Sequence, residues 1–506
     1  MGLVTIPLVV VLFSWRHPAG AVWLHLWRTQ LLELIANTVL LAAGVGLGTL
    51  LVGTALAWLV VGYQFPGRRM FEWALVLPLA VPAYVIGFVF LGIFDFAGPV
   101  QSTLRAWLGA SARPPALPAG FGVAIVMTLV FYPYVYLLAR TAFREQGLAT
   151  VEAARILGRS RAQAFREVVL PMARPSLVAG ASLAMMEAVA DFGTVATFGF
   201  RTLTESIYRV WTGMFDRTAA TQLASLLLLF ALALLAFERA LRRSRRFTQS
   251  QRRGPGAVPV HLHGMAAAGA TLFCTLVLGL GFVLPLAQLA AWAVAGLRSE
   301  LSRDFGELLW SSFVLAGGAA ALICAVALIV AYAARLHPSP SVHFATQFAS
   351  MGYALPGAVI AVGVLGPIAW LGLTGSAIAV LFAYVVRFLA VGFQTIEASL
   401  GKIPPAFDEA AHSLGVGTGA TLRRVHLPLL RHGVLTALIL AWVETMKELP
   451  ATLLLRPLGL KTLAIEVWER TSESMWVEAA LPALAIVLVG LVPLYLTARL
   501  RPGLLR

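Results

Sequence analysis

Two pairs of acidic residues lie inside apolar stretches of this sequence. Glu187 and Asp191 form the first pair, and Glu444 and Glu448 form the second. The residues of each pair are four positions apart, so they share one face of a helix. Ionisable side chains at membrane depth are costly and usually face a pore or a partner group. The sequence therefore predicts that these four carboxylates line a pathway for a cation.

A structural role explains the same carboxylates. Lys447 lies three residues after Glu444 and can pair with it, and neighbouring helix N-termini can stabilise the other carboxylates. Pro450 breaks the helix just after the second pair, and the region of Gly193 and Gly199 loosens the first copy. Such breaks are tolerated where backbone lines a cavity, although packing kinks are commoner.

Each acidic pair follows a copy of the same polar loop. Residues 152–171 read EAARILGRSRAQAFREVVLP, and residues 409–428 read EAAHSLGVGTGATLRRVHLP. The copies are offset by 257 positions, and the correspondence continues without a gap to Glu187 and Glu444. A repeat of this length in a hydrophobic chain indicates that one folding unit was duplicated and fused.

The loop sequence predicts a helix-turn-helix on the inner surface of a membrane. In the first copy, which starts at Glu152, Ala153, Ala154 and Leu157 share a helical face that another protein can approach closely. Gly158 fits the left-handed position just past a helix end, and a second short helix follows over about 160–169. Pro171 then starts the next element. The second copy offers the same residue types: Glu409, Ala410, Ala411, Leu414, Gly415 and Pro428.

One loop alone would be equally typical of an amphipathic hairpin lying among lipid headgroups. Two copies with identical spacing favour a surface that binds another protein.

The composition indicates whether the chain lies in water or in a membrane. Of its 506 residues, 59% are hydrophobic and 12% charged, and the mean hydropathy is +0.84. Because a soluble domain carries about 25% charged residues, we expect an all-α integral membrane protein. The net charge of +15 does not indicate nucleic acid, since the arginines cluster between apolar spans. Cys274 and Cys324 lie in apolar runs and are too sparse for a disulfide framework or a metal site.

Twelve apolar segments are candidates for membrane spans, which need about 20 residues each. The first, 3–15, is short, but it lacks the basic region and cleavage site of a signal peptide. The others are 37–61, 71–93, 119–140, 176–198, 218–238, 265–293, 310–334, 345–371, 374–396, 433–455 and 479–498.

Arginine placement predicts the orientation. Arginines flank both repeated loops, the stretch 239–256 and the C-terminal end, all on one side of a twelve-span topology. The positive-inside rule places that side, with both termini, in the cytoplasm. We therefore expect two parallel six-helix repeats. The predicted domains are 1–238 and 261–506, joined by an Arg-rich cytoplasmic linker, 239–260.

The repeated loop resembles the coupling-loop motif of ABC importer permeases. The shared features are Glu-Ala-Ala, a Gly six residues after the Glu, and a hydrophobe-Leu-Pro at the end. In that family the loop inserts into a groove on a separate ATPase subunit, whose ATP-driven closure switches the permease between inward and outward opening. Two copies in one chain resemble a fused permease with the type I importer fold.

The resemblance also implies partners and a location. The partners are two copies of a cytoplasmic ABC ATPase subunit and a periplasmic or lipid-anchored substrate-binding protein. The location is the bacterial inner membrane, and no nucleic acid is involved. The sequence contains no G-x-x-x-x-G-K-[ST] phosphate loop, so we expect ATP and Mg to bind the partner ATPase. The chain is then a transport subunit with no cofactor of its own and no enzyme activity.

Three segments look like parts of fused permeases of ferric-iron importers: MEAVADFGTVATFGF, MKELPATLLLRPLGLKTLAIEVWE and AALPALAIVLVGLVPL. A hard trivalent cation favours oxygen ligands, which the carboxylates supply. His261 and His263 are more typical of a solvated linker than of a metal site. Because the binding protein would hold most of the selectivity, we expect no high-affinity metal site in this chain.

Other functions remain open at this point. A fused permease for thiamine, a polyamine or an oxyanion would carry the same loops, although the carboxylates disfavour the oxyanion. An ion-coupled secondary transporter could use the carboxylates as proton or sodium sites, but it gives no reason for two matched loops. An intramembrane enzyme would need a convergent nucleophile or metal cluster, and the sequence offers none.

Two outer segments, 199–217 and 456–478, are related at an offset of 260 residues and carry aromatic side chains among charges. We expect Tyr208, Trp211, Trp468 and Trp476 to help dock the binding protein. An aromatic belt at the membrane interface is the alternative.

Overall fold

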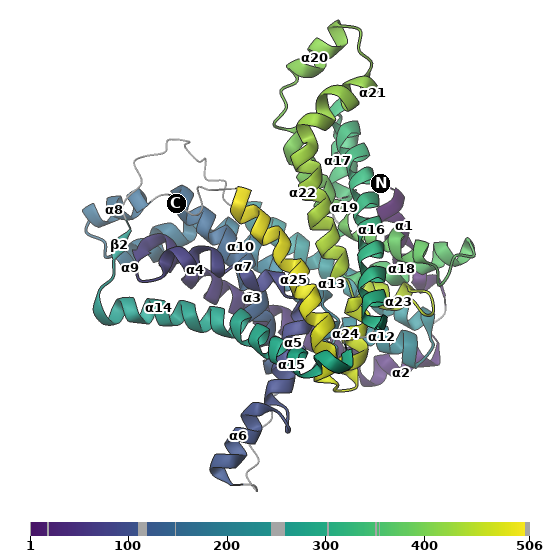
Figure 1. The fold of residues 1–506 in the computed structure, drawn as a ribbon. Coiled ribbons are helices and arrows are strands. Elements are labelled where there is room, and N and C mark those ends of the chain that lie inside the picture. Colours follow the sequence, from purple (N-terminus) through teal and green to yellow (C-terminus); the bar gives the residue numbers. More distant parts are fainter. Residues whose placement is uncertain are drawn as a thin grey trace.

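The computed structural model describes residues 2–17, 20–109, 119–146, 148–243, 259–300, 303–349, 352–353 and 355–500. Nearly all of these residues are helical (Figure 1). The predicted linker, 239–260, lies mostly outside the described residues.

The first half contains these elements: α1 (Gly2–Phe13), η1 (Ser14–Arg16), α2 (Ala21–Thr29), α3 (Leu31–Gly62), β1 (Tyr63–Gln64), α4 (Arg68–Ala74), η2 (Leu77–Ala80), α5 (Ala83–Phe94), α6 (Pro99–Leu108), α7 (Ala119–Gln146), α8 (Leu148–Ile156), α9 (Arg161–Ala164), η3 (Phe165–Val169), α10 (Leu170–Ala190), α11 (Gly193–Thr197), α12 (Leu203–Gly213) and α13 (Arg217–Arg243).

The second half contains these elements: β2 (Val260–His261), α14 (Gly264–Leu278), η4 (Gly279–Val283), α15 (Leu284–Glu300), α16 (Arg303–Leu336), α17 (Pro340–Ala349), α18 (Gly357–Trp370), α19 (Ala377–Leu400), α20 (Ala406–Ser413), α21 (Thr418–Thr421), η6 (Leu422–His426), α22 (Leu427–Met446), α23 (Pro450–Leu455), α24 (Leu463–Ser472) and α25 (Trp476–Leu500).

The predicted all-α polytopic fold is confirmed. Among the described residues, ten helices are long and apolar enough to cross a membrane. A bent pair, Val4–Arg16 with Ala21–Thr29, makes eleven if it is counted as one span. α18 is a shorter apolar helix at the ninth predicted position. The first and ninth of the twelve predicted spans are therefore not single long helices.

The third and ninth predicted spans, 71–93 and 345–371, are broken in the same way. In the first half α4, η2 and α5 replace a continuous helix, and Pro82 precedes α5 in an extended conformation. In the second half α17 and α18 are separate, and Pro356 precedes α18 in the same conformation. A proline cannot donate the backbone hydrogen bond that a continuous helix would need there.

The two halves exchange their first spans. α1 packs against α18 of the second half, while α15 packs against α5 and α25. β1 and β2 pair in parallel, with Tyr63 opposite Val260 and Gln64 opposite His261. Each of the two apolar cores accordingly contains buried residues from both halves. The domain boundaries 1–238 and 261–506 remain predictions. Helices from the two predicted domains pack together in both apolar cores.

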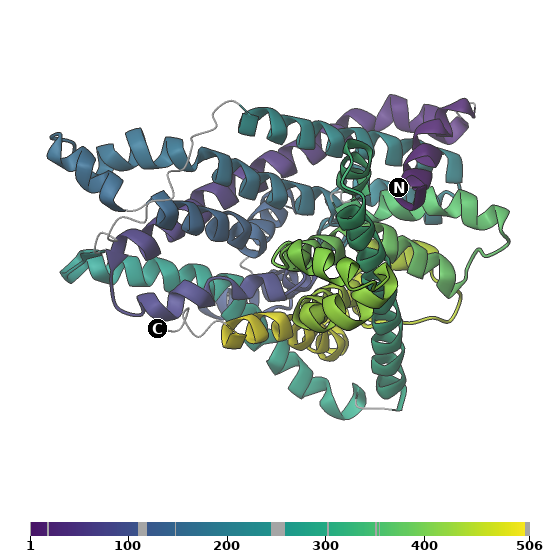
Figure 2. The same cartoon turned by 90° about the horizontal axis from the view of Figure 1, so that it is seen from above.

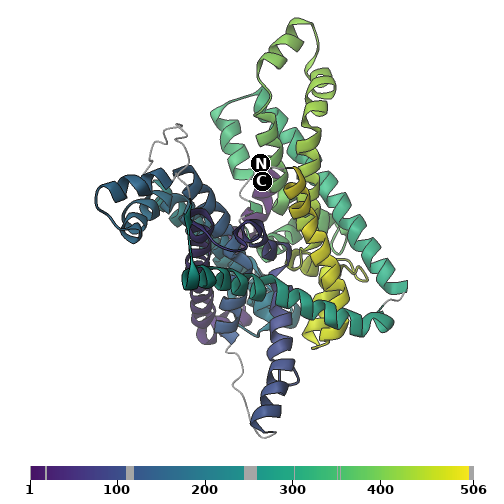
Figure 3. The same cartoon turned by 60° about the vertical axis from the view of Figure 1, so that its left-hand side comes forward.

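The repeated loops lie at the tips of two diverging arms. Figure 1 shows α8 and α9 at the left and α20 and α21 at the top, while α6 projects from the opposite end of the molecule. Figure 3 shows the same divergence after rotation. From above, the helices of the first half run lengthwise and α22 is seen nearly end-on, so the two bundles cross steeply (Figure 2).

Candidate functional site

The structure brings all four predicted carboxylates to one cavity at the junction of the two halves. The cavity has a volume of about 340 Å³, and it is lined by Glu187, Asp191, Glu444 and Glu448. In each half the first carboxylate lies near the end of a long helix, α10 or α22, and the second lies just past it. The broken spans also reach the cavity, at Pro82 in the first half.

The second carboxylate of each pair caps the short helix that follows the break. Asp191 Oδ1 accepts a hydrogen bond from the backbone N–H of Thr194 at 2.7 Å, at the start of α11. Glu448 Oε1 accepts one from the backbone N–H of Ala451 at 3.0 Å, at the start of α23. Free N–H groups and the helix dipole both favour a negative charge at that position. These hydrogen bonds are of the kind that the structural interpretation of the carboxylates, as stabilisers of neighbouring helix N-termini, predicts.

A basic residue that the sequence argument missed also lines the cavity. Arg387, on α19, donates to Glu448 Oε1 at 2.8 Å. The exposed fractions of the two side chains are 12% and 4%. Gly357 leaves room for this ion pair, since a Cβ there would overlap the Arg387 guanidinium and the Glu448 carboxylate. A single arginine in the apolar run of α19 was the available signal, because charges at membrane depth need partners.

The two remaining carboxylates differ in their partners. Lys447 Nζ donates to Glu444 Oε1 at 3.2 Å, the pairing that the sequence spacing allowed. Glu187 shares the cavity lining with Tyr353, which belongs to the second half. Among the described residues, Glu187 and Asp191 have no ion-pair partner. The cavity therefore holds four carboxylates and two cations, and the uncompensated negative charge comes from the first half.

One residue that lines the cavity, Phe192, belongs to a cluster of three aromatic rings. The ring centroid of Phe192 lies 4.8 Å from those of both Tyr208 and Trp468. Tyr208 and Trp468 occupy equivalent positions in the repeat, and their centroids are 6.4 Å apart. Equivalent residues meet only near the axis that relates the two copies. This cluster therefore lies on the pseudo-twofold axis, where the halves join.

The four aromatic residues expected to dock the binding protein contact other side chains of the chain. Tyr208 and Trp468 contact each other, and Trp476 stacks on Phe88 with centroids 6.3 Å apart. Trp211 lies 5.4 Å from the guanidinium of Arg217. All four side chains are only partly buried, so their role in docking stays a prediction.

The repeated loops have the predicted helix-turn-helix geometry. Gly158 follows α8 with φ of 84°, and Gly415 follows α20 with φ of 73°, so both are left-handed. Pro171 and Pro428 lie in the first turns of α10 and α22. Between the short second helix and the long helix, both copies contain a π-helical stretch, η3 and η6. Single π-helical turns often occur at functional positions.

Exposure divides the predicted loop residues into two groups. Leu157 and Leu414 are 81% and 80% exposed. The exposed group also contains Glu152, Ala153, Gly158, Pro171, Glu409, Ala410, Gly415 and Pro428. Ala154 and Ala411 are buried against their own arms, which corrects the expectation that both alanines of each loop face a partner. A helix lying on its own arm can present only one face outward.

The second loop is anchored by a network that the first loop lacks at the equivalent place. Arg335, at the end of α16, donates to Asp408 Oδ2 at 2.6 Å and to the carbonyls of Leu400 and Ile403. His426 Nε2 lies 3.2 Å from Asp408 Oδ1. The first loop instead has a capping box between Ser160 and Gln163, on the loop itself.

We expect Arg335→Ala to loosen the second loop. Hydrogen bonds to charged groups contribute about 1.5–3 kcal/mol. Partial exposure reduces this to roughly 1 kcal/mol here, or about fivefold in a local opening equilibrium. Amide hydrogen exchange across α20 should accelerate by that factor. Arg159→Ala is the matched control, because its pair with Glu167 at 3.3 Å is exposed. Unchanged exchange in the Arg335 variant would contradict the anchoring role.

Comparisons with known proteins agree with the repeated architecture. The family described as "Binding-protein-dependent transport system inner membrane component" matches residues 49–247 and 323–506, once in each half. The chain is 28% identical to the Fe(3+)-transport system permease protein FbpB 2 of Haemophilus influenzae, covering 93% of this chain and 90% of that protein.

Two further relatives differ in how much of the chain they match. The ferric transport system permease protein FbpB of Actinobacillus pleuropneumoniae is 24% identical, covering 85% of this chain and 65% of that protein. The sulfate transport system permease protein CysT of Salmonella typhimurium is 31% identical, covering 36% of this chain and 66% of that protein.

Proposed function

Because the chain belongs to the family of binding-protein-dependent transport system inner membrane components, we propose that it is the fused permease of an ABC importer for ferric iron. The observation that carries this cargo is the similarity to a Haemophilus Fe(3+) permease over 93% of the chain. A periplasmic or lipid-anchored binding protein would deliver the iron, and the chain would pass it across the inner membrane.

The cavity chemistry supports a cationic cargo. Glu187 and Asp191 provide oxygen ligands whose charge no described cation neutralises directly. A hard cation prefers oxygen donors. The helix break at Pro82 lines the cavity, and breaks of this kind are tolerated where they line a polar path. In this proposal the carboxylates hold the ion only transiently, since tight binding would prevent release.

The loops would couple this path to ATP. Two copies of an ATPase subunit would each receive one loop through its exposed face, at Leu157 in one arm and Leu414 in the other. The arms that carry the loops diverge in Figures 1 and 3. ATP-driven closure of the ATPase dimer would draw the arms together and change which side of the membrane the cavity faces.

An oxyanion is the second candidate, favoured by the partial similarity to a sulfate permease and by Arg387 and Lys447 in the cavity. Both cations are already paired with carboxylates, which leaves little positive charge for an anion. Thiamine and polyamines are cations, so the cavity charge does not separate them from iron.

Reconstitution tests the cargo. The purified chain, its ATPase and its binding protein would be placed in liposomes, and ATP hydrolysis measured with the binding protein loaded with iron, thiamine, a polyamine or sulfate, or left empty. We expect stimulation by the iron-loaded form, together with uptake of radioactive iron. Stimulation by the sulfate or thiamine form alone would replace the cargo assignment. Transport without any ATPase would instead indicate a secondary transporter.

We expect the double variant Glu187→Gln/Glu444→Gln to lower iron uptake by at least about threefold. Glutamine retains the size of glutamate but removes the charge that would attract a cation. Uptake per molecule of reconstituted protein is the measurement, with equal expression and unchanged ATPase binding. Glu397→Gln, an exposed change on α19, is the control. Full uptake by the double variant would assign these carboxylates a purely structural role.

A further inference from the structure

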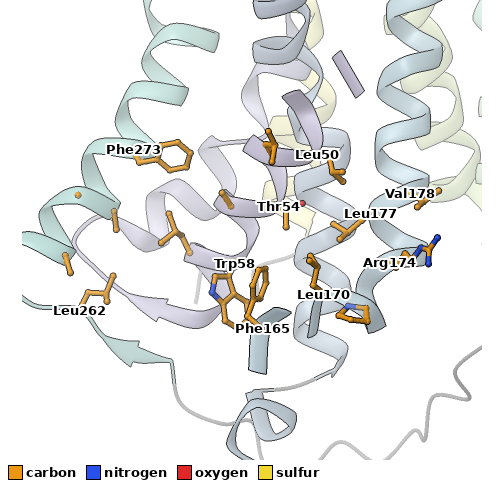
Figure 4. Close-up of a pocket in the computed structure, with 17 residues that line it drawn as sticks. Leu50, Thr54, Trp58, Phe165, Leu170, Arg174, Leu177, Val178, Leu262 and Phe273 are labelled. Atoms are coloured by element: carbon orange, nitrogen blue, oxygen red, sulfur yellow. The ribbon is translucent and has the colours of Figure 1, made fainter. Parts of the chain in front are cut away.

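A second, larger cavity opens on the first half between α3, α10 and α14. It has a volume of about 1050 Å³, and Figure 4 shows it enclosed by Leu50, Trp58, Phe165 and Phe273 among others. All but two of its 17 lining residues are apolar; the exceptions are Thr54 and Arg174. The three helices belong to candidate membrane spans.

The length of the groove matches one leaflet. Its wall on α3 extends from Leu50 to Leu59. Nine residue steps at about 1.5 Å each give about 14 Å. Half of the hydrocarbon core of a bilayer is about 15 Å. Residues near the loop, such as Pro171 and Leu262, line one end of the groove, and Phe273 on α14 lies deeper.

The polar groups of the groove favour an anionic headgroup. Arg174 lies at the rim, in the loop-side part of α10 (Figure 4). Its side chain is exposed, and among the described residues it pairs with no carboxylate. The lining includes no acidic side chain. The hydroxyl of Thr54 is buried without a hydrogen-bond partner within the described structure.

We propose that this groove binds one anionic phospholipid of the leaflet on the loop side. The acyl chains lie between α3 and α14, and the phosphate contacts Arg174. Apolar burial supplies about 25 cal/mol per Å², and the guanidinium adds selectivity for the phosphate charge. This proposal depends on the membrane location of the chain and not on the cargo.

The site also contacts the first loop. Phe165 lines the groove, and its ring centroid lies 4.5 Å from that of Trp58 on α3, so the two rings form part of the same wall. Phe165 is the first residue of η3, the π-helical stretch that joins the loop helices to α10. A lipid between these rings and α14 therefore supports the base of one loop.

Photo-crosslinking tests the lipid site. The purified full-length chain would be placed in phosphatidylcholine nanodiscs that contain a little phosphatidylglycerol with a photoreactive acyl chain, or the matching phosphatidylcholine probe. We expect the phosphatidylglycerol probe to label residues 50–59 and 262–273 at least fivefold more than the phosphatidylcholine probe, and excess inorganic phosphate not to compete.

Two pairs of variants sharpen the test. Gly269→Leu fills the groove without a clash and should lower labelling at least fivefold, whereas Gly318→Leu, on an open face of α16, should not. Arg174→Gln should abolish the preference for phosphatidylglycerol, whereas Arg431→Gln, its equivalent in the second copy, should retain it. Thermal unfolding confirms that each variant folds. Equal labelling by both probes in the unmodified chain would overturn the proposal, and so would unchanged labelling in Gly269→Leu. Native mass spectra that show a bound polypeptide in place of a lipid would overturn it as well.

Discussion

The Arg387→Met variant is expected to lose about 3–5 kcal/mol of folding stability, the usual cost of leaving one member of a buried ion pair without its partner. Glu448, whose side chain is 4% exposed, would then keep only the backbone N–H of Ala451 as a donor. The free energy of unfolding of the purified protein in detergent is the measurement. Low yield and early aggregation should accompany the loss.

The double variant Arg387→Met/Glu448→Gln distinguishes this cause from a general packing defect. Removing both charges should restore most of the stability, because a neutral amide can still accept the hydrogen bond from Ala451. Arg159→Met is the control for an exposed pair and should change stability little. If the double variant is as unstable as Arg387→Met alone, the unpaired charge of Glu448 is not the cause of the instability.

Replacing Gly158 and Gly415 together with alanine is expected to weaken ATPase binding by about 30-fold or more. A left-handed backbone costs a non-glycine residue about 1–2 kcal/mol. Two loops bind in the proposed complex, and about 1.4 kcal/mol corresponds to a tenfold change in affinity. Both glycines have positive φ and open space around them, so strain rather than a clash causes the effect. Titration of the ATPase against the purified chain measures it.

Substitutions of two other glycines serve as controls, one in the same loop without backbone strain and one with the same strain far from the loops. Gly419→Ala changes the same loop at a position with ordinary φ and open space, and it should bind the ATPase normally. Gly372→Ala introduces the same backbone strain, at φ of 70°, in the turn after α18 and far from the loops. It should also bind normally. Loss of binding in either control would show that the loop glycines have no special role.

The sequence predicted the features that depend on local spacing. The offset of 257 residues placed the helix-turn-helix in both copies, and the left-handed Gly158 and Gly415 followed from their positions past a helix end. The break after the second acidic pair followed from Pro450, which begins α23. These features depend on the few residues that precede and follow each position, and the sequence contains that information completely.

Contacts between helices were not predictable in the same way. The pair of Arg387 and Glu448 joins α19 to the start of α23, 61 positions apart in the chain, and no periodicity connects them. The ring cluster of Phe192, Tyr208 and Trp468 likewise needs the two halves to meet on their common axis. Tyr208 and Trp468 lie in outer segments of the sequence, and their contact with each other and with Phe192 leaves them only partly exposed.

The sequence by itself determined a duplicated, polytopic helical chain with two matched loops and two acidic pairs on helix faces. Only the tertiary structure decided that the first spans are exchanged between halves, that Ala154 and Ala411 face inward, and that two cations share the cavity with four carboxylates. The reason is physical. Helix formation and chain turns are governed by neighbours within about four residues, whereas burial and charge pairing are governed by which distant helices pack together.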